Sequence, residues 1–124
     1  LIKNNKITME NFLAADHVFI SIDGISNSPV DLTLAKMGKK RNKMVSVNYY
    51  QAAIEIVRQT DCIISLSSNV SELVNNTNEF DVVSLPFKSD EFSVKLIWNK
   101  RSTDDPANAW MRSILFGLKD EVFL

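Results

Sequence analysis

Apolar and polar positions along this chain switch repeatedly between the period of a strand and the period of a helix. Short runs rich in β-branched and aromatic residues, such as HVFISI at 17–22, predict strands. Runs with apolar residues three and four positions apart, such as YQAAIEIVRQT at 50–60, predict helices. Further strands are expected at KMVSVNY (43–49), DCIISLS (61–67), FDVVSLPF (80–87) and FSVKLIWN (92–99).

One predicted helix carries residues typical of both helix ends. In SPVDLTLAKMG, at 28–38, Ser28 is a candidate N-cap and Pro29 occupies the first helical position. Gly38 is expected to end this helix, because glycine readily adopts the left-handed conformation that follows many helices. A shorter helix is expected at NVSELVNN, residues 69–76.

The last predicted helix follows a charged turn near the end of the chain. It begins at Pro106, with Asp105 as its cap, and Trp110 is expected to lie in the core. The apolar stripe that defines this helix consists of Ala107, Trp110, Met111, Ile114, Leu115 and Leu118.

Alternation of strands and helices predicts an α/β fold, a three-layer α-β-α sandwich with a mixed, largely parallel sheet. Ligands of such folds bind at the carboxyl ends of the strands, and a helix that starts there offers N–H groups to an anion. The candidate site residues delivered to this edge are Ser21, Ile22 and Asp23 after the first strand, Asn48, Tyr49 and Tyr50 after the second, and Ser65 to Ser68 after the third.

Composition limits the class of protein. The 124 residues suffice for one domain or part of one, and 45% hydrophobic with 23% charged residues is typical of a globular chain. A net charge of −1 gives no electrostatic case for nucleic acid or an anionic membrane, and no apolar run approaches a membrane span. The single cysteine, Cys62, indicates a reducing cytoplasm. A start at Leu1, with no signal-peptide core, suggests a fragment of a longer protein.

The C-terminal stretch LIWNKRSTDDPANAWMRSIL (96–115) resembles the end of the effector-binding domain of LysR-type transcriptional regulators. Three upstream stretches resemble the same domain, in the same order and at similar spacing. They are TMENFLAADHVFIS (8–21), VDLTLAKMGKKRNKMVSV (30–47) and TDCIISLS (60–67). Within the family, the branch of nodulation and nitroaromatic-responsive regulators is the most similar.

The resemblance implies a two-lobed domain like a type 2 periplasmic binding protein, with a small-molecule effector between the lobes. Residues 8–90 would form the second lobe, and residues 91–124 the return crossover strand and the last helix of the first lobe. It also implies a dimer of effector domains within a tetramer, paired through 29–37 and 43–47. DNA would be bound only by an N-terminal helix-turn-helix outside this chain, so the chain alone is not expected to bind DNA specifically.

By the same resemblance, the positions that border the effector cleft are Asn48, Tyr49, Tyr50, Ser67, Ser68 and Asn99. The full set of candidate effector-binding residues is Ser21, Ile22, Asp23, Asn48, Tyr49, Tyr50, Ser67, Trp98 and Asn99. The chain differs from the family pattern in having Asn99 where histidine is common, and Ser67 and Ser68 where proline is common. The effector itself is expected to be a small molecule, carboxylated or aromatic.

Other chemistry-bearing residues favour ordinary structural roles. The basic run from Lys36 to Lys43 is interpreted as a solvated helix end, and His17 as a strand-edge residue rather than a metal ligand. No nucleophile motif, phosphate loop or set of metal ligands is present, so neither an enzyme nor a cofactor is expected. A solute-binding protein of an import system shares the predicted fold and is the alternative; the DPANAWMRSIL stretch favours the regulator.

Overall fold

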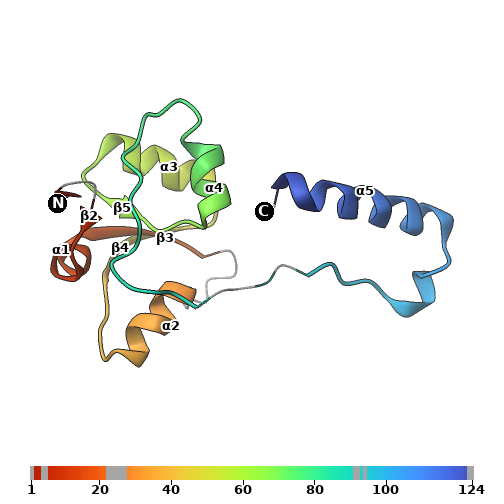
Figure 1. Ribbon diagram of the computed structural model, residues 1–124, viewed down its shortest axis with the longest axis horizontal. Helices are drawn as coiled ribbons and strands as arrows, with labels where there is room; N and C mark the ends of the chain where they lie inside the picture. Colours follow the sequence, from red (N-terminus) through yellow and green to blue (C-terminus); the bar gives the residue numbers. More distant parts are fainter. Residues whose placement is uncertain (1, 4–5, 22–27, 91–92, 94, 123–124) are drawn as a thin grey trace. The chain divides into compact units, whose positions relative to one another are not determined.

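The computed structural model describes residues 2–3, 6–21, 28–90, 93 and 95–122. The chain divides into two compact units, Leu1–Phe92 and Ser93–Leu124, and each is described by itself. Figure 1 labels the helices and strands of both units.

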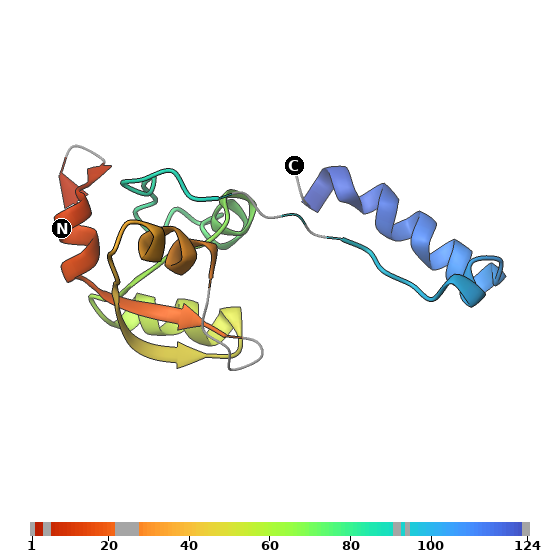
Figure 2. The ribbon, with the colours of Figure 1, turned by 90° about the horizontal axis from the view of Figure 1, so that it is seen from below.

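A three-stranded parallel sheet is the centre of the first unit. Its strands are β3 (Asp16–Ile20), β4 (Asn42–Val47) and β5 (Ile63–Ile64), in the order β4-β3-β5. β3 and β4 run side by side in the same direction (Figure 2). The predicted α/β fold with a parallel sheet is therefore confirmed. The remaining elements of this unit are β1 (Ile2–Lys3), β2 (Lys6–Ile7), α1 (Met9–Ala14), α2 (Pro29–Lys36), α3 (Tyr50–Gln59) and α4 (Ser68–Val74).

Successive residues of β3 face opposite sides of the sheet, and each side is covered by helices. Val18 packs with Ala53 and Cys62 in a core beneath α3. On the other side, the His17 ring lies edge-on to Phe12, with 4.6 Å between centroids. The buried residues of that second core are Ile7, Phe12, Val30 and Leu34. Figure 1 shows α2 and α3 on opposite sides of the strands, the arrangement of a three-layer sandwich.

Both predicted ends of α2 are confirmed. The Ser28 hydroxyl accepts from the backbone N–H of Asp31, and the Asp31 carboxylate accepts from the backbone N–H of Ser28, which completes a capping box. Gly38 follows the helix with φ +67°, and its N–H donates to the carbonyl of Ala35 at 3.0 Å. The next N–H, of Lys39, donates to the Leu34 carbonyl, as in a Schellman motif.

The strand predicted at 80–87 is wrong. The chain there is irregular, and its apolar residues pack on the core beneath α1 and α2 without pairing to another strand. The segment is fixed at its start by Asn75, whose side chain bonds both the N–H and the carbonyl of Phe80. Its alternating pattern therefore reflects one-sided burial against the core. The residues that make this contact are Val83, Leu85 and Phe87.

The strand predicted at 92–99 is also wrong over the part that the structure describes. Residues 93 and 95–99 have no strand pairing, and residues 92 and 94 lie outside the described residues. The second unit continues with a 3-10 turn, η1 (Lys100–Ser102), and then α5 (Pro106–Val122). Asp105 caps α5 as predicted, because its carboxylate accepts from the Asn108 backbone N–H at 2.8 Å.

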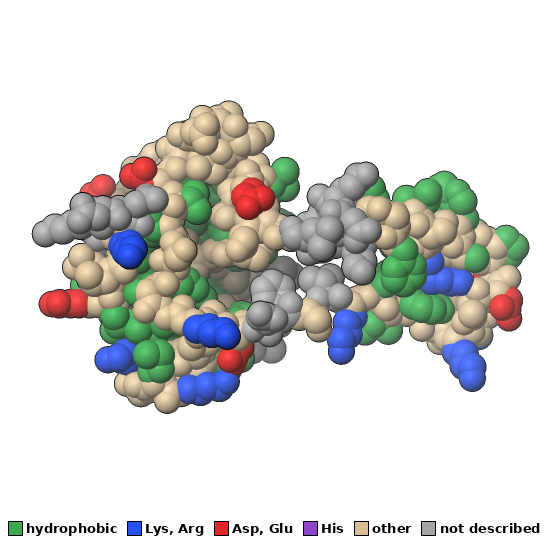
Figure 3. Space-filling model, in the orientation of Figure 1, with side chains coloured by type: hydrophobic (Ala, Val, Ile, Leu, Met, Phe, Trp, Pro, Cys, Tyr) green, Lys and Arg blue, Asp and Glu red, His purple; other side chains and the backbone are tan. Residues whose placement is uncertain are grey.

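The apolar stripe of α5 is exposed, so the prediction that Trp110 lies in the core is wrong. Trp110 is 62% exposed and Phe116 54%. Figure 3 shows hydrophobic side chains along the surface of this unit. The amphipathic pattern correctly predicts the helix, but the described residues of this unit provide no core for it to cover. The members of the predicted stripe that are exposed are Ala107, Trp110, Met111, Ile114, Leu115 and Leu118.

Candidate functional site

The carboxyl edge of the sheet brings together three of the segments that the sequence singles out. Ser21 follows β3, is buried, and donates its backbone N–H to the carbonyl of Val47 at 2.9 Å. Asn48 follows β4, and Ser65 follows β5. Hydroxyl and amide groups therefore end neighbouring parallel strands, where an α/β sheet commonly binds its ligand.

Two tyrosines begin the helix at this edge. Tyr49 is the N-cap residue of α3, forms no side-chain capping hydrogen bond, and is 72% exposed. Tyr50 is the first residue of α3 and is also exposed, so the structure buries neither ring. The first N–H groups of a helix have no intrahelical acceptor, and the helix dipole favours an anion beside them. An aromatic ring and a helix N-terminus thus adjoin at residues 49–51.

The remaining candidates lie at the start of α4, in the second unit, or outside the described residues. Ser67 is the N-cap residue of α4, a helix of seven residues, and makes no side-chain capping bond. Ile22 and Asp23 lie outside the described residues. Trp98 and Asn99 belong to the second unit, so the structure describes their local surroundings only.

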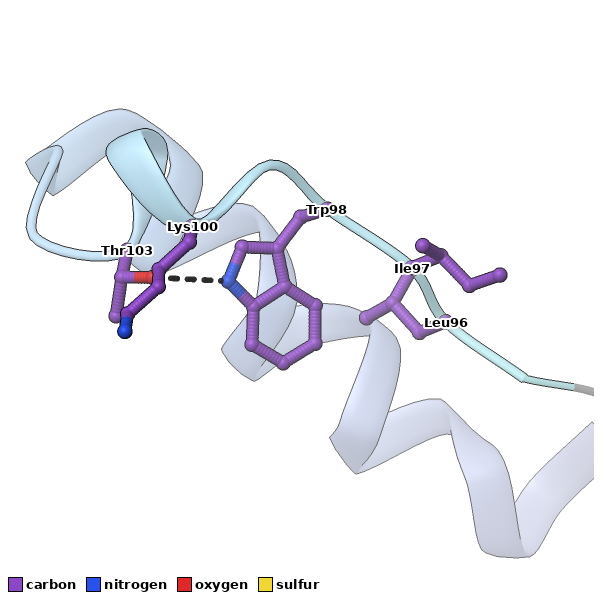
Figure 4. Close-up of a pocket in the computed structure, with 5 residues that line it drawn as sticks. All are labelled: Leu96, Ile97, Trp98, Lys100 and Thr103. Atoms are coloured by element: carbon purple, nitrogen blue, oxygen red, sulfur yellow. Dashed lines mark hydrogen bonds between the residues drawn. The ribbon is translucent and has the colours of Figure 1, made fainter.

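Trp98 lines an open hollow of about 310 Å³ on the second unit (Figure 4). Its indole N–H donates to the Thr103 hydroxyl at 3.2 Å, and the Arg112 guanidinium lies over its ring at 4.9 Å. Asn99 has a structural role here, because its side-chain oxygen accepts from the Arg101 backbone N–H and caps η1. The residues lining the hollow are Leu96, Ile97, Trp98, Lys100 and Thr103.

A buried ionic cluster lies beneath α2 in the first unit. Arg41 donates through Nε and Nη2 to the two carboxylate oxygens of Asp31, at 2.9 and 3.1 Å. The side chain of Arg41 is 2% exposed and that of Asp31 is 11% exposed. Lys43 adds a second positive charge 3.4 Å from the same carboxylate. Two parallel charge-assisted hydrogen bonds between buried partners form a strong, geometrically defined contact.

The electrostatics of the cluster follow from burial and these contacts. Burial alone would raise the pKa of the Asp31 carboxyl, but hydrogen bonds from Arg41 and Ser28 outweigh it and lower that pKa to about 2. Burial lowers the pKa of His17, against the opposing effect of its bond to the Phe12 carbonyl. Because Arg41 Nη1 donates toward His17 Nδ1 at 3.5 Å, the proton of the neutral ring lies on Nε2, which donates to Phe12 at 2.7 Å.

Two sequence interpretations are corrected by this cluster. The sequence predicts that the whole basic run is solvated, but Arg41 is buried. His17 is fully buried in the central strand of the sheet, whereas the sequence predicts a position at a strand edge. The local sequence pattern that involves this cluster is the spacing of Ser28 and Asp31, and that pattern indicates only the start of a helix. Arg41 meets Ser65, 24 positions away, and such a distant contact leaves no local pattern.

The described residues contain no group of three or more His, Cys, Asp or Glu side chains that could hold a metal ion. Among the same residues, no helix combines the length and apolar character needed to cross a membrane. Every buried side-chain nitrogen or oxygen in the described part of the chain has a hydrogen-bond partner. The candidate ligand contacts of the first unit are the hydroxyl, amide and aromatic groups at the carboxyl edge.

No family model matches the chain, but curated relatives do. The activator NahR of Pseudomonas putida is 22% identical over 90% of this chain and 37% of its own length. PhcA of Ralstonia nicotianae and LinR of Sphingobium indicum are each 23% identical over 86% of this chain. All three are HTH-type transcriptional regulators of the LysR type. The resemblance to LysR-type regulators is thereby confirmed.

The chain spans about a third of the length of these relatives, namely 37%, 33% and 36%. Because the relatives are regulators, the alternative of a solute-binding protein is not favoured. The assignment to the nodulation and nitroaromatic branch of LysR-type regulators stays a prediction.

Solved structures share the fold. The regulatory domain of MexT, a transcriptional activator of Pseudomonas aeruginosa, aligns with a TM-score of 0.78 and 23% identity over 92% of this chain and 57% of that one. A protein of Vibrio parahaemolyticus assigned as a transcriptional regulator aligns with a TM-score of 0.73 over 96% of this chain and 55% of its own. The chain therefore shares the fold of the MexT regulatory domain.

Proposed function

We propose that this chain is the effector-sensing part of a bacterial LysR-type transcriptional regulator that acts in the cytoplasm. The observation that carries the proposal is the carboxyl edge of the sheet, where Ser21, Asn48 and Tyr49 adjoin the N-terminus of α3 within a regulatory-domain fold. In the full protein, residues 8–90 would form one lobe, and residues 91–124 the crossover segment and a helix of the other lobe. DNA would be bound by a helix-turn-helix outside this chain.

The effector expected at this edge is a small carboxylated or aromatic molecule. A carboxylate placed at the start of α3 would gain roughly 0.3–1 kcal/mol from the helix dipole. A ring stacked on Tyr49 would gain about another 0.5–1.5 kcal/mol. Ser21 and Ser67 are candidates for further hydrogen bonds from neighbouring strand ends. These contributions select a chemical class of effector rather than one compound.

Effector binding would act by shifting a conformational equilibrium. An effector stabilises one lobe arrangement over another only by its difference in affinity for the two, and that difference limits the response. In a dimer paired through α2 and β4, such a shift would change the spacing of the DNA-binding parts. Exposed apolar side chains on or next to these elements support that pairing: Leu32 on α2, Met37 at its C-cap and Met44 on β4.

The test is a reporter assay on the full-length protein with Asn48→Ala and Tyr49→Ala. We expect each variant to need about tenfold more inducer for half-maximal response, a change of about 1.4 kcal/mol. Asn76→Ala is the matched control, because Asn76 is exposed just beyond the far end of α4. Unchanged dose dependence in both folded variants would show that the effector does not bind at this edge.

A further inference from the structure

We propose that Arg41 is a positioning residue that holds the start of α2 and the carboxyl end of β5 in a fixed relation. The inference deepens the proposed function, on which it rests, because β5 ends at the edge where the effector is expected. Arg41 itself lies before β4 and beneath α2, and it does not belong to the edge. It would act on the effector site through the elements that it joins.

The first step is the anchoring of the guanidinium. Its two hydrogen bonds to Asp31 fix the plane of the group, and the Phe19 ring of β3 lies beneath it, 5.7 Å from centroid to Cζ. Both partners are almost fully enclosed, so water screens the contact little. A guanidinium held on one side by a carboxylate and on another by an aromatic face has little freedom to rotate.

The second step is what the remaining N–H groups reach. Nη2 donates to the Ser28 hydroxyl at 3.1 Å, and Nη1 donates to the Ser65 hydroxyl at 3.4 Å. Ser28 is the N-cap residue of α2, and Ser65 directly follows β5. One side chain from the start of β4 therefore contacts the start of the preceding helix and the end of the following strand. These two segments lie in different β-α units, and Arg41 joins them directly.

The third step is the consequence for the edge. Asp31 closes the capping box of α2 and also anchors Arg41, so a displacement of the helix start would be transmitted to the guanidinium and to Ser65. Ser65 leads directly into Ser67 and α4, which carry a candidate effector contact. A lysine could keep the charge beside Asp31, but a single ammonium cannot hold the planar set of contacts to Asp31, Ser28 and Ser65.

The test is hydrogen–deuterium exchange on the full-length protein with Ser65→Ala and Arg41→Lys. Ser65 has no hydrogen bond to α2, so a simple loss of its hydroxyl would affect only its own surroundings. If Arg41 couples the two segments, both variants should raise exchange about threefold to tenfold at residues 30–33 as well as at 65–68. Arg58→Lys is the matched control and should leave both segments unchanged, because Arg58 is an exposed arginine of α3 that pairs with Glu79.

The outcomes separate the positioning role from the proposed function. If exchange at residues 30–33 is unchanged in the Ser65→Ala variant, the coupling between the start of α2 and the end of β5 is wrong. This result decides the question even if the Arg41→Lys variant fails to fold. Binding of benzoate, a carboxylated aromatic probe, is measured by calorimetry on the same variants. A several-fold weakening in Arg41→Lys with little change in Arg58→Lys would support transmission to the effector edge, because Arg41 itself does not belong to that edge. Failure of the wild-type protein to bind benzoate would contradict the proposed effector class, and the exchange result would still decide the coupling.

Discussion

His17 is a neutral imidazole enclosed in the central strand, with Phe12 and Arg41 as hydrogen-bond partners. Burial disfavours the charged ring and so lowers the pKa of His17 below the usual 6.5 of an imidazole. The unfolded chain therefore takes up a proton near pH 6.5 that the folded chain does not. Stability is complete above this pH and is lost as the pH falls below it.

We predict that the free energy of unfolding falls by up to about 1.4 kcal/mol for each pH unit between 6.5 and the lowered pKa of His17 in the folded chain. Urea unfolding measured from neutral pH down through this range would show the slope. His17→Gln should be less stable at neutral pH but should lack this slope, because the amide does not titrate. An identical slope in the variant would assign the acid sensitivity to other groups.

Asp31 forms ion pairs with both Arg41 and Lys43. We predict that Asp31→Asn costs about 3 kcal/mol of unfolding free energy, because Arg41 then stays buried without a countercharge. Since the pKa of Asp31 is about 2, this contribution is present above pH 3.8 and is lost as the pH falls toward 2.

Asp90→Asn provides the control for this prediction. Asp90 pairs with Lys36, but both side chains are more than half exposed, so the expected cost is below about 1 kcal/mol. Equal losses from the two aspartate variants in chemical unfolding would contradict the importance assigned to the buried pair.

At the scale of the elements, replacing Gly38 or Gly117 by alanine should change the free energy of unfolding in opposite directions. Gly38 follows α2 with φ +67°, where a Cβ is disfavoured, whereas Gly117 lies within α5. Neither would bring a Cβ within 4 Å of another group, so the difference is conformational. We predict that Gly38→Ala costs about 1 kcal/mol, and that Gly117→Ala raises the helicity of α5, worth up to about 1 kcal/mol. Thermal unfolding followed by circular dichroism measures both, and a stabilised Gly38→Ala would contradict the argument.

The sequence predicts those elements whose determinants are local. The ends of α2 depend on residues within a few positions of one another, namely Ser28 with Asp31 and Gly38 with the preceding turn. The start of α5 depends in the same way on Asp105 and Pro106. β3 and β4 are found within one or two residues of their predicted ends where the structure describes them.

The errors concern what an apolar pattern packs against. Alternation at 80–87 is explained by burial of one side of an irregular segment, and a strand additionally requires a paired neighbour. The apolar stripe of α5 predicts a core beneath this helix, but the described residues form no such core and the stripe is exposed. Arg41 was missed because its partners are 10 to 24 positions away in the chain, so its burial is a property of the tertiary fold.

At the scale of the whole molecule, exposed apolar side chains occur on both units. On the first unit they include Leu32, Met37 and Met44 on α2, its C-cap and β4, and on the second Trp110 and Phe116 on α5. Large contiguous apolar surfaces of a monomer drive association in water. Pairing through α2 and β4 is the arrangement that we propose for the effector domain, whereas exposed apolar residues on α5 would cause association independently of that pairing.

We predict that the 124-residue chain forms dimers or larger species at high concentration, and that the two surfaces contribute separately. Trp110→Glu with Phe116→Lys places charges on α5 and should reduce association through that helix. Leu32→Glu with Met44→Lys does the same on α2 and β4. Glu55→Gln is the control, since Glu55 is an exposed residue of α3. Sedimentation velocity over a concentration series measures each species. If only the double substitution on α5 lowers the sedimenting mass, the α2–β4 surface does not mediate pairing in this chain. A wild-type chain that stays monomeric at the highest concentration would contradict association through either surface.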